Sequence, residues 1–346
     1  MADQWDGASG GVNPAQQLMS YARGYMSSQI VGAAARLKLA EHLADGPLTS
    51  AELAGKLGAD VEGTRRLLRA AASIGLVERL ADDRFGETTM TTLLRPGPRS
   101  LSSFVLSFTS PGLYRPLEQM HNVVLDGHSH TSDVLGKGLW EYYKENPEES
   151  TWFAETMSEQ SEFAADIVVP RLDVKDVKRI VDVGGSHGVL LSRVLEANPH
   201  TTGVLFDLPE VVERAKDFVG RRGLLDRVEF VPGSFLEELP KGGDLYLLKS
   251  ILCDWDDDSC VRVLSNFREA AEPGTPLVVS DWLLPEQPDT FLDITNLGLL
   301  AYTDGKVRTE AQYRELFDRA GVELERITTA SDNWLQVTLL EARRPA

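Results

Sequence analysis

Cysteine is scarce in this chain, and long apolar runs are absent. Only two of the 346 residues are cysteine, Cys253 and Cys260, and their separation lacks the paired spacing of a zinc site or a disulfide framework. We therefore expect no metal and a reducing compartment. No stretch of about 18 or more apolar residues occurs, and the N-terminal segment carries acids where a secretory signal carries positive charge. These absences predict a cytoplasmic protein without a membrane partner.

Basic residues are also few. The chain has 35 Lys and Arg against 53 Asp and Glu, a formal net charge of −18. Such a surface repels the backbone of DNA or RNA, because neutralisation of phosphates by Lys and Arg supplies most nonspecific affinity. Nucleic acid is not an expected partner. The hydrophobic content of 42% is enough for a substantial core, and the length favours two domains.

Helical patterns fill the first hundred residues. Thr49 with Ser50, and Asp60, occupy N-cap positions before two short helices, and Gly75 ends the second. Residues 76–88 follow as two short strands about a polar turn, which completes the helix-turn-helix and hairpin of a winged helix. Residues 1–100 hold two Lys and nine Arg against eleven Asp and Glu, so no basic face supports DNA binding. We interpret this part as a packing or dimerisation module, with a metabolite-sensing regulator as the alternative.

The middle of the chain, about residues 101–172, is predicted as helices interrupted by Pro111, Gly112 and Pro147. It is rich in aromatic residues and Met. Most of these belong to the core, but some are expected to line an apolar ligand pocket.

A strand, a glycine-rich turn and a helix begin near Lys178. Gly184, Gly185 and Gly188 allow a tight turn and close approach of the backbone to a ligand. Asp207 ends the next strand, 19 positions after Gly188, where a carboxylate accepts the hydroxyls of a ribose. Further strands and a closing hairpin predict a parallel sheet with an antiparallel edge. An ordinary strand-to-helix turn without a nucleoside remains the alternative.

Five spaced motifs carry a resemblance to a known family. They are VDVGGSHG, FDLPEVVERA, RVEFVPGSF, DLYLLKSILCDWDDDSCVRVL and DGKVRTEAQYRELFDRAGV. The chain resembles the plant-type and bacterial small-molecule O-methyltransferases that use S-adenosyl-L-methionine. The resemblance implies an α/β fold with a class I methyltransferase Rossmann-like sheet and an N-terminal all-helical winged-helix dimerisation domain. It implies a homodimer, with residues 1–105 for dimerisation, 106–172 as a helical connector to the substrate pocket, and 173–346 for the cofactor.

The same resemblance assigns site residues. The cofactor set is Asp182, Gly184, Gly185, Gly188, Asp207, Leu208, Ser234, Phe235 and Lys249. Within it the glycines form the turn, Asp207 holds the ribose, Phe235 packs on the adenine and Lys249 meets the carboxylate. The substrate pocket is expected to include Trp140, Phe153, Met157, Trp282, Asn296 and Tyr302.

The chain departs from the family pattern where the chemistry occurs. Cys253 replaces the histidine that serves as general base, and Val307 replaces one of the two acids that orient it. Asp281 is a shorter substitute for the other acid. Ser234 stands where an aspartate commonly bonds the adenine. The two departures are chemically related, because an acid that orients an imidazole has no function once the imidazole is absent.

Cys253, Asp254 and Asp281 remain the candidate catalytic residues. A thiol ionises near pH 8.5, and no cation close in the sequence lowers that value, so we interpret Cys253 as shaping the pocket. The acids at 256–258 are interpreted as a helix start, and Asp254 is the exception. His187 is interpreted as a turn residue, and His128 and His130 are candidates for a loop near the pocket.

These patterns together predict an S-adenosylmethionine-dependent methyltransferase that acts on a small aromatic or polyketide-like natural product. General acid–base catalysis contributes about 10²–10⁴ in rate, whereas alignment of donor and acceptor supplies about 7–11 kcal/mol. We therefore expect O-methylation of an acidic hydroxyl by proximity, without a histidine base. The alternatives are C- or N-methylation, or a repurposed hydroxylase or cyclase that binds the cofactor without transferring its methyl group.

Overall fold

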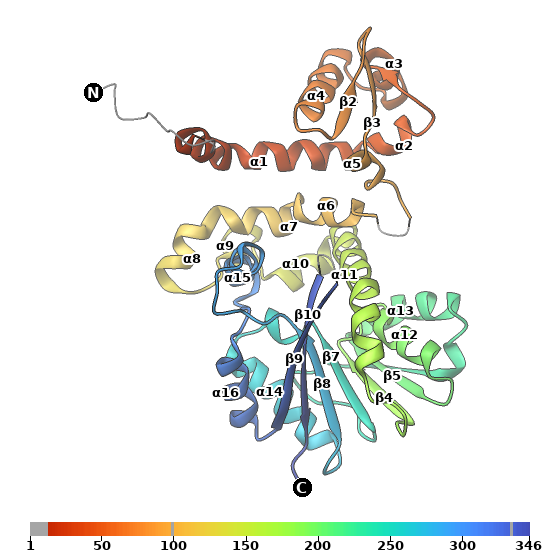
Figure 1. The fold of residues 1–346 in the computed structure, drawn as a ribbon, viewed down its shortest axis with the longest axis vertical. Helices are drawn as coiled ribbons and strands as arrows, with labels where there is room; N and C mark the ends of the chain where they lie inside the picture. The colour runs from red at the N-terminus through yellow and green to blue at the C-terminus, as the bar shows by residue number, and fades with distance from the viewer. Residues whose placement is uncertain (1–12, 98–99, 333–334) are drawn as a thin grey trace. The chain divides into compact units, whose positions relative to one another are not determined.

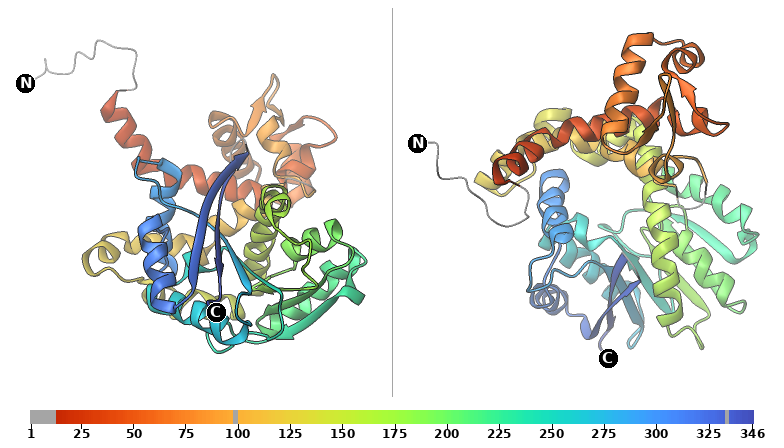
Figure 2. Two further views of the ribbon diagram at one scale, coloured as in Figure 1. Left: turned by 60° about the horizontal axis from the view of Figure 1, so that its bottom comes forward. Right: turned by 45° about the horizontal axis from the view of Figure 1, so that its top comes forward.

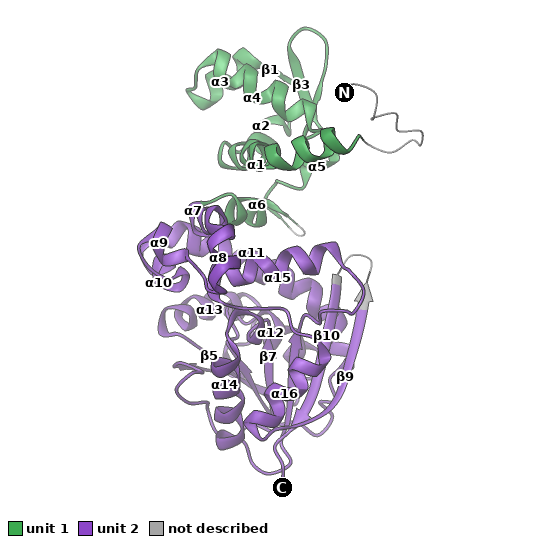
Figure 3. Ribbon diagram, turned by 90° about the vertical axis from the view of Figure 1, so that its left-hand side faces the viewer, with its two compact units in different colours: residues 1–110 green, residues 111–346 purple. Residues whose placement is uncertain are grey.

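The computed structural model describes residues 13–97, 100–332 and 335–346, which form two compact units divided between Ser110 and Pro111 (Figure 3). Helices of residues 111–172 belong to the same unit as the large sheet. The functional boundaries at 105/106 and 172/173 stay predictions. Among the described residues, no helix is long and apolar enough to cross a membrane.

The first unit combines helices with a small antiparallel sheet of order β1-β3-β2. Its elements are α1 Pro14–Arg36, α2 Leu39–Leu43, β1 Leu48–Thr49, α3 Ser50–Leu57, α4 Val61–Ser73, β2 Val77–Arg79, β3 Arg84–Glu87, α5 Thr89–Thr92 and α6 Ser102–Phe108. The predicted caps are confirmed, since Thr49 forms a capping box with Glu52 and the Asp60 side chain accepts from Gly63 N. The predicted hairpin is confirmed as well. The unit is therefore not all-helical, which corrects what the family resemblance implied. Strand β1 was not predicted, because two residues are too few to show a strand pattern in the sequence.

The second unit begins with short helices and continues with alternating strands and helices. Its first part contains α7 Pro111–Tyr114, η1 Arg115–Gln119, α8 Met120–Asp126, α9 Thr131–Leu135, α10 Leu139–Glu145, α11 Pro147–Val168 and η2 Val169–Arg171. Pro111 and Pro147, expected as breaks, are each the first residue of a helix, where a missing N–H costs nothing.

The alternating part runs from β4 to the C-terminus. It contains β4 Arg179–Val183, α12 Val189–Ala197, β5 Thr202–Asp207, α13 Pro209–Arg221, η3 Leu225–Arg227, β6 Val228–Pro232, β7 Leu245–Lys249, η4 Leu252–Asp254, α14 Asp257–Ala270, β8 Pro276–Asp281, α15 Thr290–Thr303, α16 Glu310–Ala320, β9 Glu323–Asp332 and β10 Leu335–Arg343. The sheet has the order β6-β5-β4-β7-β8-β10-β9. Strands β4 to β8 are parallel and β10 runs antiparallel to its neighbours, which confirms the predicted antiparallel edge.

Helices cover both faces of this sheet (Figures 1 and 2). Helices α14 and α16 pack on one face around Val181 and Phe267, and α11, α12 and α13 pack on the other around Ile180 and Leu191. Successive residues of β4 enter opposite cores, as the alternation of side chains along a strand requires.

The order of the parallel strands brings the residues of the site together at the carboxyl ends of the strands. From β4 the chain continues to β5 and β6 on one side of β4 and then crosses to β7 on the other side, so a crevice opens at the carboxyl ends of β4 and its neighbours. Gly184 follows β4, and Asp207, Lys249 and Asp281 end β5, β7 and β8. Residues far apart in sequence therefore meet at these strand ends.

Candidate cofactor and acceptor site

The turn after β4 requires glycine. Gly184 and Gly188 have left-handed backbones, with φ of 67° and 79°. A Cβ at Gly184 would lie 2.4 Å from Ile251 Cδ1, and one at Gly188 would lie 2.7 Å from Leu205 Cδ1. Gly188 precedes α12, whose first N–H groups point toward the turn. The predicted glycine turn thus has the shape that brings a backbone close to a ligand.

Asp207 supports this turn from the end of β5. Its two carboxylate oxygens accept from Ser186 N at 2.9 Å and from Leu208 N at 2.7 Å. Burial raises the pKa of Asp207, and these two hydrogen bonds oppose that rise. Each oxygen keeps a lone pair for a ribose hydroxyl. Ser186 itself has a φ of 50°, an unusual conformation for a residue with a side chain.

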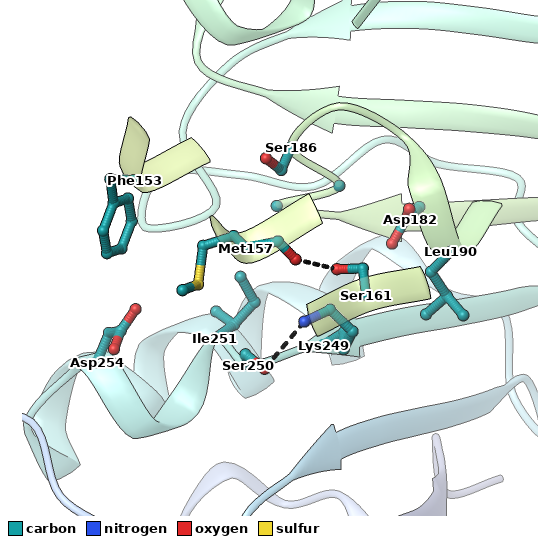
Figure 4. A pocket seen from close by; sticks show the side chains of 12 residues that line it. Phe153, Met157, Ser161, Asp182, Ser186, Leu190, Lys249, Ser250, Ile251 and Asp254 are labelled. Carbon is teal, nitrogen blue, oxygen red and sulfur yellow. Dashed lines mark hydrogen bonds between the residues drawn. The ribbon is translucent and has the colours of Figure 1, made fainter. Parts of the chain in front are cut away.

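One cavity, with a volume of about 140 Å³, joins the turn to the ends of β7 and η4 (Figure 4). Seven of its lining residues were predicted for the site: Phe153, Met157, Asp182, Gly184, Gly185, Lys249 and Asp254. Five were not predicted: Ser161, Ser186, Leu190, Ser250 and Ile251. Phe153, Met157 and Ser161 are spaced by four on α11, and that periodicity is the signal that would have found Ser161.

The inner end of the cavity carries a buried acid and a buried base. Asp182 Oδ2 is buried and has no hydrogen-bond partner, and burial raises the pKa of Asp182 to about 7. Lys249 Nζ donates to Ser250 Oγ at 3.1 Å, and burial lowers the pKa of Lys249. An ammonium group would supply the partner that Asp182 lacks, and a carboxylate suits Lys249. The cavity therefore fits the charged methionine end of S-adenosylmethionine.

Ser234 and Phe235 follow β6 and do not line this cavity, although the Phe235 ring lies beside the turn. The Phe235 ring is 3.6 Å from the position of a Gly184 Cβ and meets the Trp255 ring edge-on at 5.7 Å. Ser234 Oγ accepts from Leu236 N at 3.3 Å. Their adenine contacts stay predictions, and so does a contact from Leu208.

Cys253 lies behind the cavity and does not line it. Its side chain is 1% exposed and packs in an apolar cluster with Val307 and Leu299. Burial, followed by the charges of Asp281 and Asp254, raises the pKa of the thiol well above its ordinary value. The thiol is consequently unsuited to accept a proton near neutral pH, and it fills space beside Val307.

Asp281 and Asp254 have different tasks. Asp281 Oδ2 accepts from Cys253 N at 3.1 Å and Oδ1 accepts from Trp282 N at 2.8 Å, so this acid holds the backbone of η4. Burial raises its pKa. Asp254 instead lines the cavity, on the side of Phe153 and Met157. Burial, with Asp281 next, raises the pKa of Asp254 to about 7.

Two residues that hold η4 were not predicted. Arg308, fully buried, donates to Leu252 O and to Trp255 O, each at 2.7 Å, and to Asp257 Oδ1 at 2.9 Å. Gly305 packs so closely that an added Cβ would lie 2.2 Å from Cys253 O. The acids at 256–258 are interpreted in the sequence as a helix start. Asp256 is the N-cap of α14, whereas Asp257 also pairs with the arginine.

The remaining predicted pocket residues divide between two neighbouring clusters. Trp140 and Tyr302 pack with Phe153, and the Trp140 and Phe153 rings meet edge-on at 5.7 Å. Trp282 packs against the Cys253 cluster, and Asn296 Oδ1 accepts from Val307 N at 2.8 Å. Of the six predicted residues, only Phe153 and Met157 line the cavity itself.

The histidines lie elsewhere. His187 Nδ1 is 2.8 Å from Ser158 Oγ, and burial lowers the His187 pKa. His130 contacts Asp126 and Asp133, and these hydrogen bonds raise its pKa. Neither residue lines the cavity, so the suggestion that the loop of His128 and His130 borders it gains no support. Over residues 13–97, 100–332 and 335–346, no group of three or more His, Cys, Asp or Glu could hold a metal ion.

Comparisons with known proteins agree with this geometry. Residues 117–323 match the model of an O-methyltransferase domain, and residues 19–95 match that of an O-methyltransferase dimerisation domain. A mitomycin biosynthesis 6-O-methyltransferase from Streptomyces lavendulae is 34% identical over 88% of each chain. An 8-amino-8-demethylriboflavin N,N-dimethyltransferase from Streptomyces davaonensis is 33% identical over 92% of this chain and 93% of the relative. A solved O-methyltransferase of neocarzinostatin biosynthesis, in complex with S-adenosyl-L-homocysteine and 1,4-dihydroxy-2-naphthoic acid, has a TM-score of 0.82 at 28% identity, covering 92% of this chain and 95% of that one.

Proposed function

Because this chain belongs to the O-methyltransferase family and is an S-adenosylmethionine-dependent methyltransferase, we propose that it methylates an acidic hydroxyl of a small aromatic natural product. One observation carries the proposal. A single cavity joins the glycine turn and Lys249 at one end to Phe153, Met157 and Asp254 at the other. Donor and acceptor would therefore meet in one cavity.

The chain's residues divide the work of holding the cofactor. The turn at Gly184–Gly188 and Asp207 would hold the nucleoside, while Lys249 and Asp182 would meet the carboxylate and ammonium of the methionine end. S-Adenosylmethionine, when bound, supplies an electrophilic methyl group on a sulfonium. The residues that line the cavity would fix the direction in which the acceptor approaches the methyl group, and rate acceleration by proximity arises from such alignment.

The acceptor end favours a flat, already acidic substrate. Phe153 and Met157 offer apolar contact, and Trp140 and Tyr302 pack behind them. Cys253 and Val307 leave no imidazole at the position of the family's usual base. A phenol beside a carbonyl or an aromatic carboxylate ionises more readily than a simple alcohol, so it fits this site better.

N-methylation is the second candidate. It is favoured by the 33% identical relative that is named as an N,N-dimethyltransferase. A neutral amine already carries its lone pair and needs no base before it attacks. Repurposed cofactor-binding chemistry, as in a hydroxylase or cyclase, is a further alternative without a specific observation in its favour.

We further propose that the protein works as a cytoplasmic homodimer. The match of residues 19–95 to a dimerisation domain supports the dimer. Cys253 and Cys260 are both free and buried, which suits a reducing compartment.

A panel of acceptors tests the proposal. Purified protein is incubated with S-adenosylmethionine and, separately, 1,4-dihydroxy-2-naphthoic acid, 2-naphthol, an aromatic amine and an aliphatic alcohol. We expect S-adenosylhomocysteine to form fastest with the acidic phenol and not at all with the alcohol. Turnover of the amine alone would favour N-methylation. Cofactor binding without S-adenosylhomocysteine from any of the four would reject the proposal.

A further inference from the structure

Two carboxyl groups line the cavity, and they lie at different ends of it. Asp182 is beside Lys249 and the glycine turn, where the methionine end of the cofactor fits. Asp254 is beside Phe153 and Met157, on the side expected to receive the acceptor (Figure 4). Among the described residues that line the cavity, Asp254 is thus the acid or base nearest to the aromatic wall.

The groups around Asp254 either have other partners or, as with the Cys253 thiol, donate to Asp254 itself. Asp281 accepts two backbone N–H groups, from Cys253 and Trp282. The Cys253 thiol packs against Val307, and its sulfur is 3.8 Å from Asp254 Oδ1. Lys249 donates to Ser250. Cys253 and Asp281 do not line the cavity, and Lys249 lines it as the cation expected to meet the cofactor carboxylate, whereas the Asp254 carboxylate borders the acceptor end.

The backbone that carries Asp254 is held tightly. Gly305 lies against it, since an added Cβ would be 2.9 Å from Asp254 Cα. Arg308 donates to the carbonyls of Leu252 and Trp255, one on each side of the Cys253–Asp254 pair. A general base needs such fixed placement, because proton transfer depends on geometry before pKa.

From this arrangement we propose that Asp254, and not Cys253, is the general base that takes the proton from the acceptor hydroxyl. The hydroxyl proton passes to an Asp254 carboxylate oxygen. At the same time a lone pair of the acceptor oxygen forms a bond to the methyl carbon, whose bond to sulfur breaks with its electron pair left on sulfur. The charges balance, because the sulfonium becomes a neutral thioether and the carboxylate becomes a neutral acid.

The electrostatics of the site suit this role. Burial first, and the charge of Asp281 second, raise the pKa of Asp254 to about 7, while Cys253 and Lys249 act in the opposite direction. A carboxylate whose pKa is about 7 is a far stronger base than one whose pKa is near 4, and about half of it is still ionised at neutral pH. The inference rests on the proposed function and adds its proton acceptor.

Asp254→Asn tests the inference, with Asp254→Glu as the conservative variant and Asp258→Asn as the matched control. Asp258 lies in the same acidic run, 89% exposed, and pairs with Arg319. With 2-naphthol and 1,4-dihydroxy-2-naphthoic acid as probes, we expect Asp254→Asn to lower kcat about 100-fold or more, with unchanged affinity for S-adenosylmethionine by calorimetry. Asp254→Glu should recover part of the rate. Asp258→Asn should behave as wild type.

A second readout does not depend on turnover. In protein labelled with carbon-13 at aspartate carboxyl groups, the resonances of Asp182 and Asp254 should titrate near pH 7. One should disappear in Asp254→Asn. An Asp254→Asn variant that keeps the wild-type kcat and pH profile, or the same two titrations, would overturn the inference and leave methyl transfer intact. Failure of the proposed function differs, because wild type itself would then form no S-adenosylhomocysteine with any acceptor.

Discussion

At the residue scale, Cys253 and Val307 determine what this site lacks. They lie in one buried apolar cluster, where a histidine and an orienting acid would need polar partners. Asp254 and Lys249, by contrast, line the cavity. The proposed proton acceptor is therefore residue 254 of η4, one position after the residue that is the histidine base in the family pattern.

Burial of the thiols predicts low reactivity. Cys253 and Cys260 are each at most 1% exposed, and burial raises both thiol pKa values, that of Cys260 to about 12. The reactive form is the thiolate, so we expect native protein at pH 8 to resist iodoacetamide for hours and to label at both positions once unfolded. Mass spectrometry of peptides measures this. Rapid modification of Cys253 in the folded enzyme would show that its thiol ionises, and Cys253 would then again be a candidate general base.

Lys249 predicts a selective loss of cofactor affinity. Lys249→Met removes the ammonium that would meet the cofactor carboxylate, and a hydrogen bond to a charged group contributes about 1.5–3 kcal/mol. We expect S-adenosylmethionine to bind at least about tenfold more weakly in titration calorimetry. Lys241→Met, at an exposed lysine, is the control and should bind normally. Equal affinity in Lys249→Met would remove Lys249 from the cofactor site.

At the element scale, the short helix η4 depends on a loop more than fifty residues away in sequence. Gly305 and Arg308 come from the segment between α15 and α16, and they contact the backbone of residues 252–255. Such a long-range brace explains how a three-residue helix holds a catalytic side chain in place. The same segment is joined to α15, because Val307 N donates to Asn296 Oδ1.

Gly305→Ala tests this brace. The new Cβ would lie 2.2 Å from Cys253 O, so the backbone must shift, and overpacking of this kind lowers the free energy of unfolding by about 1–3 kcal/mol. We expect kcat/KM for the acceptor to fall while S-adenosylmethionine affinity is retained. Gly55→Ala, in α3 with no heavy atom within 4 Å of an added Cβ, is the control and should be neutral or stabilising. Wild-type stability and activity in Gly305→Ala would show that the brace is unnecessary.

The elements themselves were largely predictable, and the site only in part. The turn at Gly184 and Gly188 and the strand end at Asp207 could be predicted because both are local features with a characteristic spacing. Thr49 and Asp60 were found as caps for the same reason. Arg308 was missed because its partners are 51 to 56 residues away, and only the folded chain joins them.

At the scale of the whole molecule, helix α1 is the surface on which we expect the dimer to form. Helix α1 exposes several large apolar side chains, with exposed fractions from 44% to 72%: Leu18, Met19, Tyr21, Tyr25 and Met26. A run of this kind on one helix of a protein with net charge −18 indicates a surface buried by association. Its position within residues 19–95, or directly before them, places it with the dimerisation domain.

Charge on α1 should dissociate the dimer. The double variant Leu18→Glu/Tyr21→Glu places two carboxylates on the expected interface, where burying an unpaired charge is costly. We expect sedimentation equilibrium to give a dimer for wild type and a monomer for the variant at micromolar concentration. Gln16→Glu, an exposed polar residue on the same helix, is the control. A stable dimer in the double variant would place the interface elsewhere.

The most direct test of the central claim, methyl transfer to an acidic acceptor, is mass spectrometry and carbon-13 NMR of the product made with S-adenosylmethionine labelled in its methyl group. We predict one labelled methyl on the oxygen of the acidic phenol, with one S-adenosylhomocysteine released per product. Conversion of the acceptor without label, or without release of S-adenosylhomocysteine, would contradict the account.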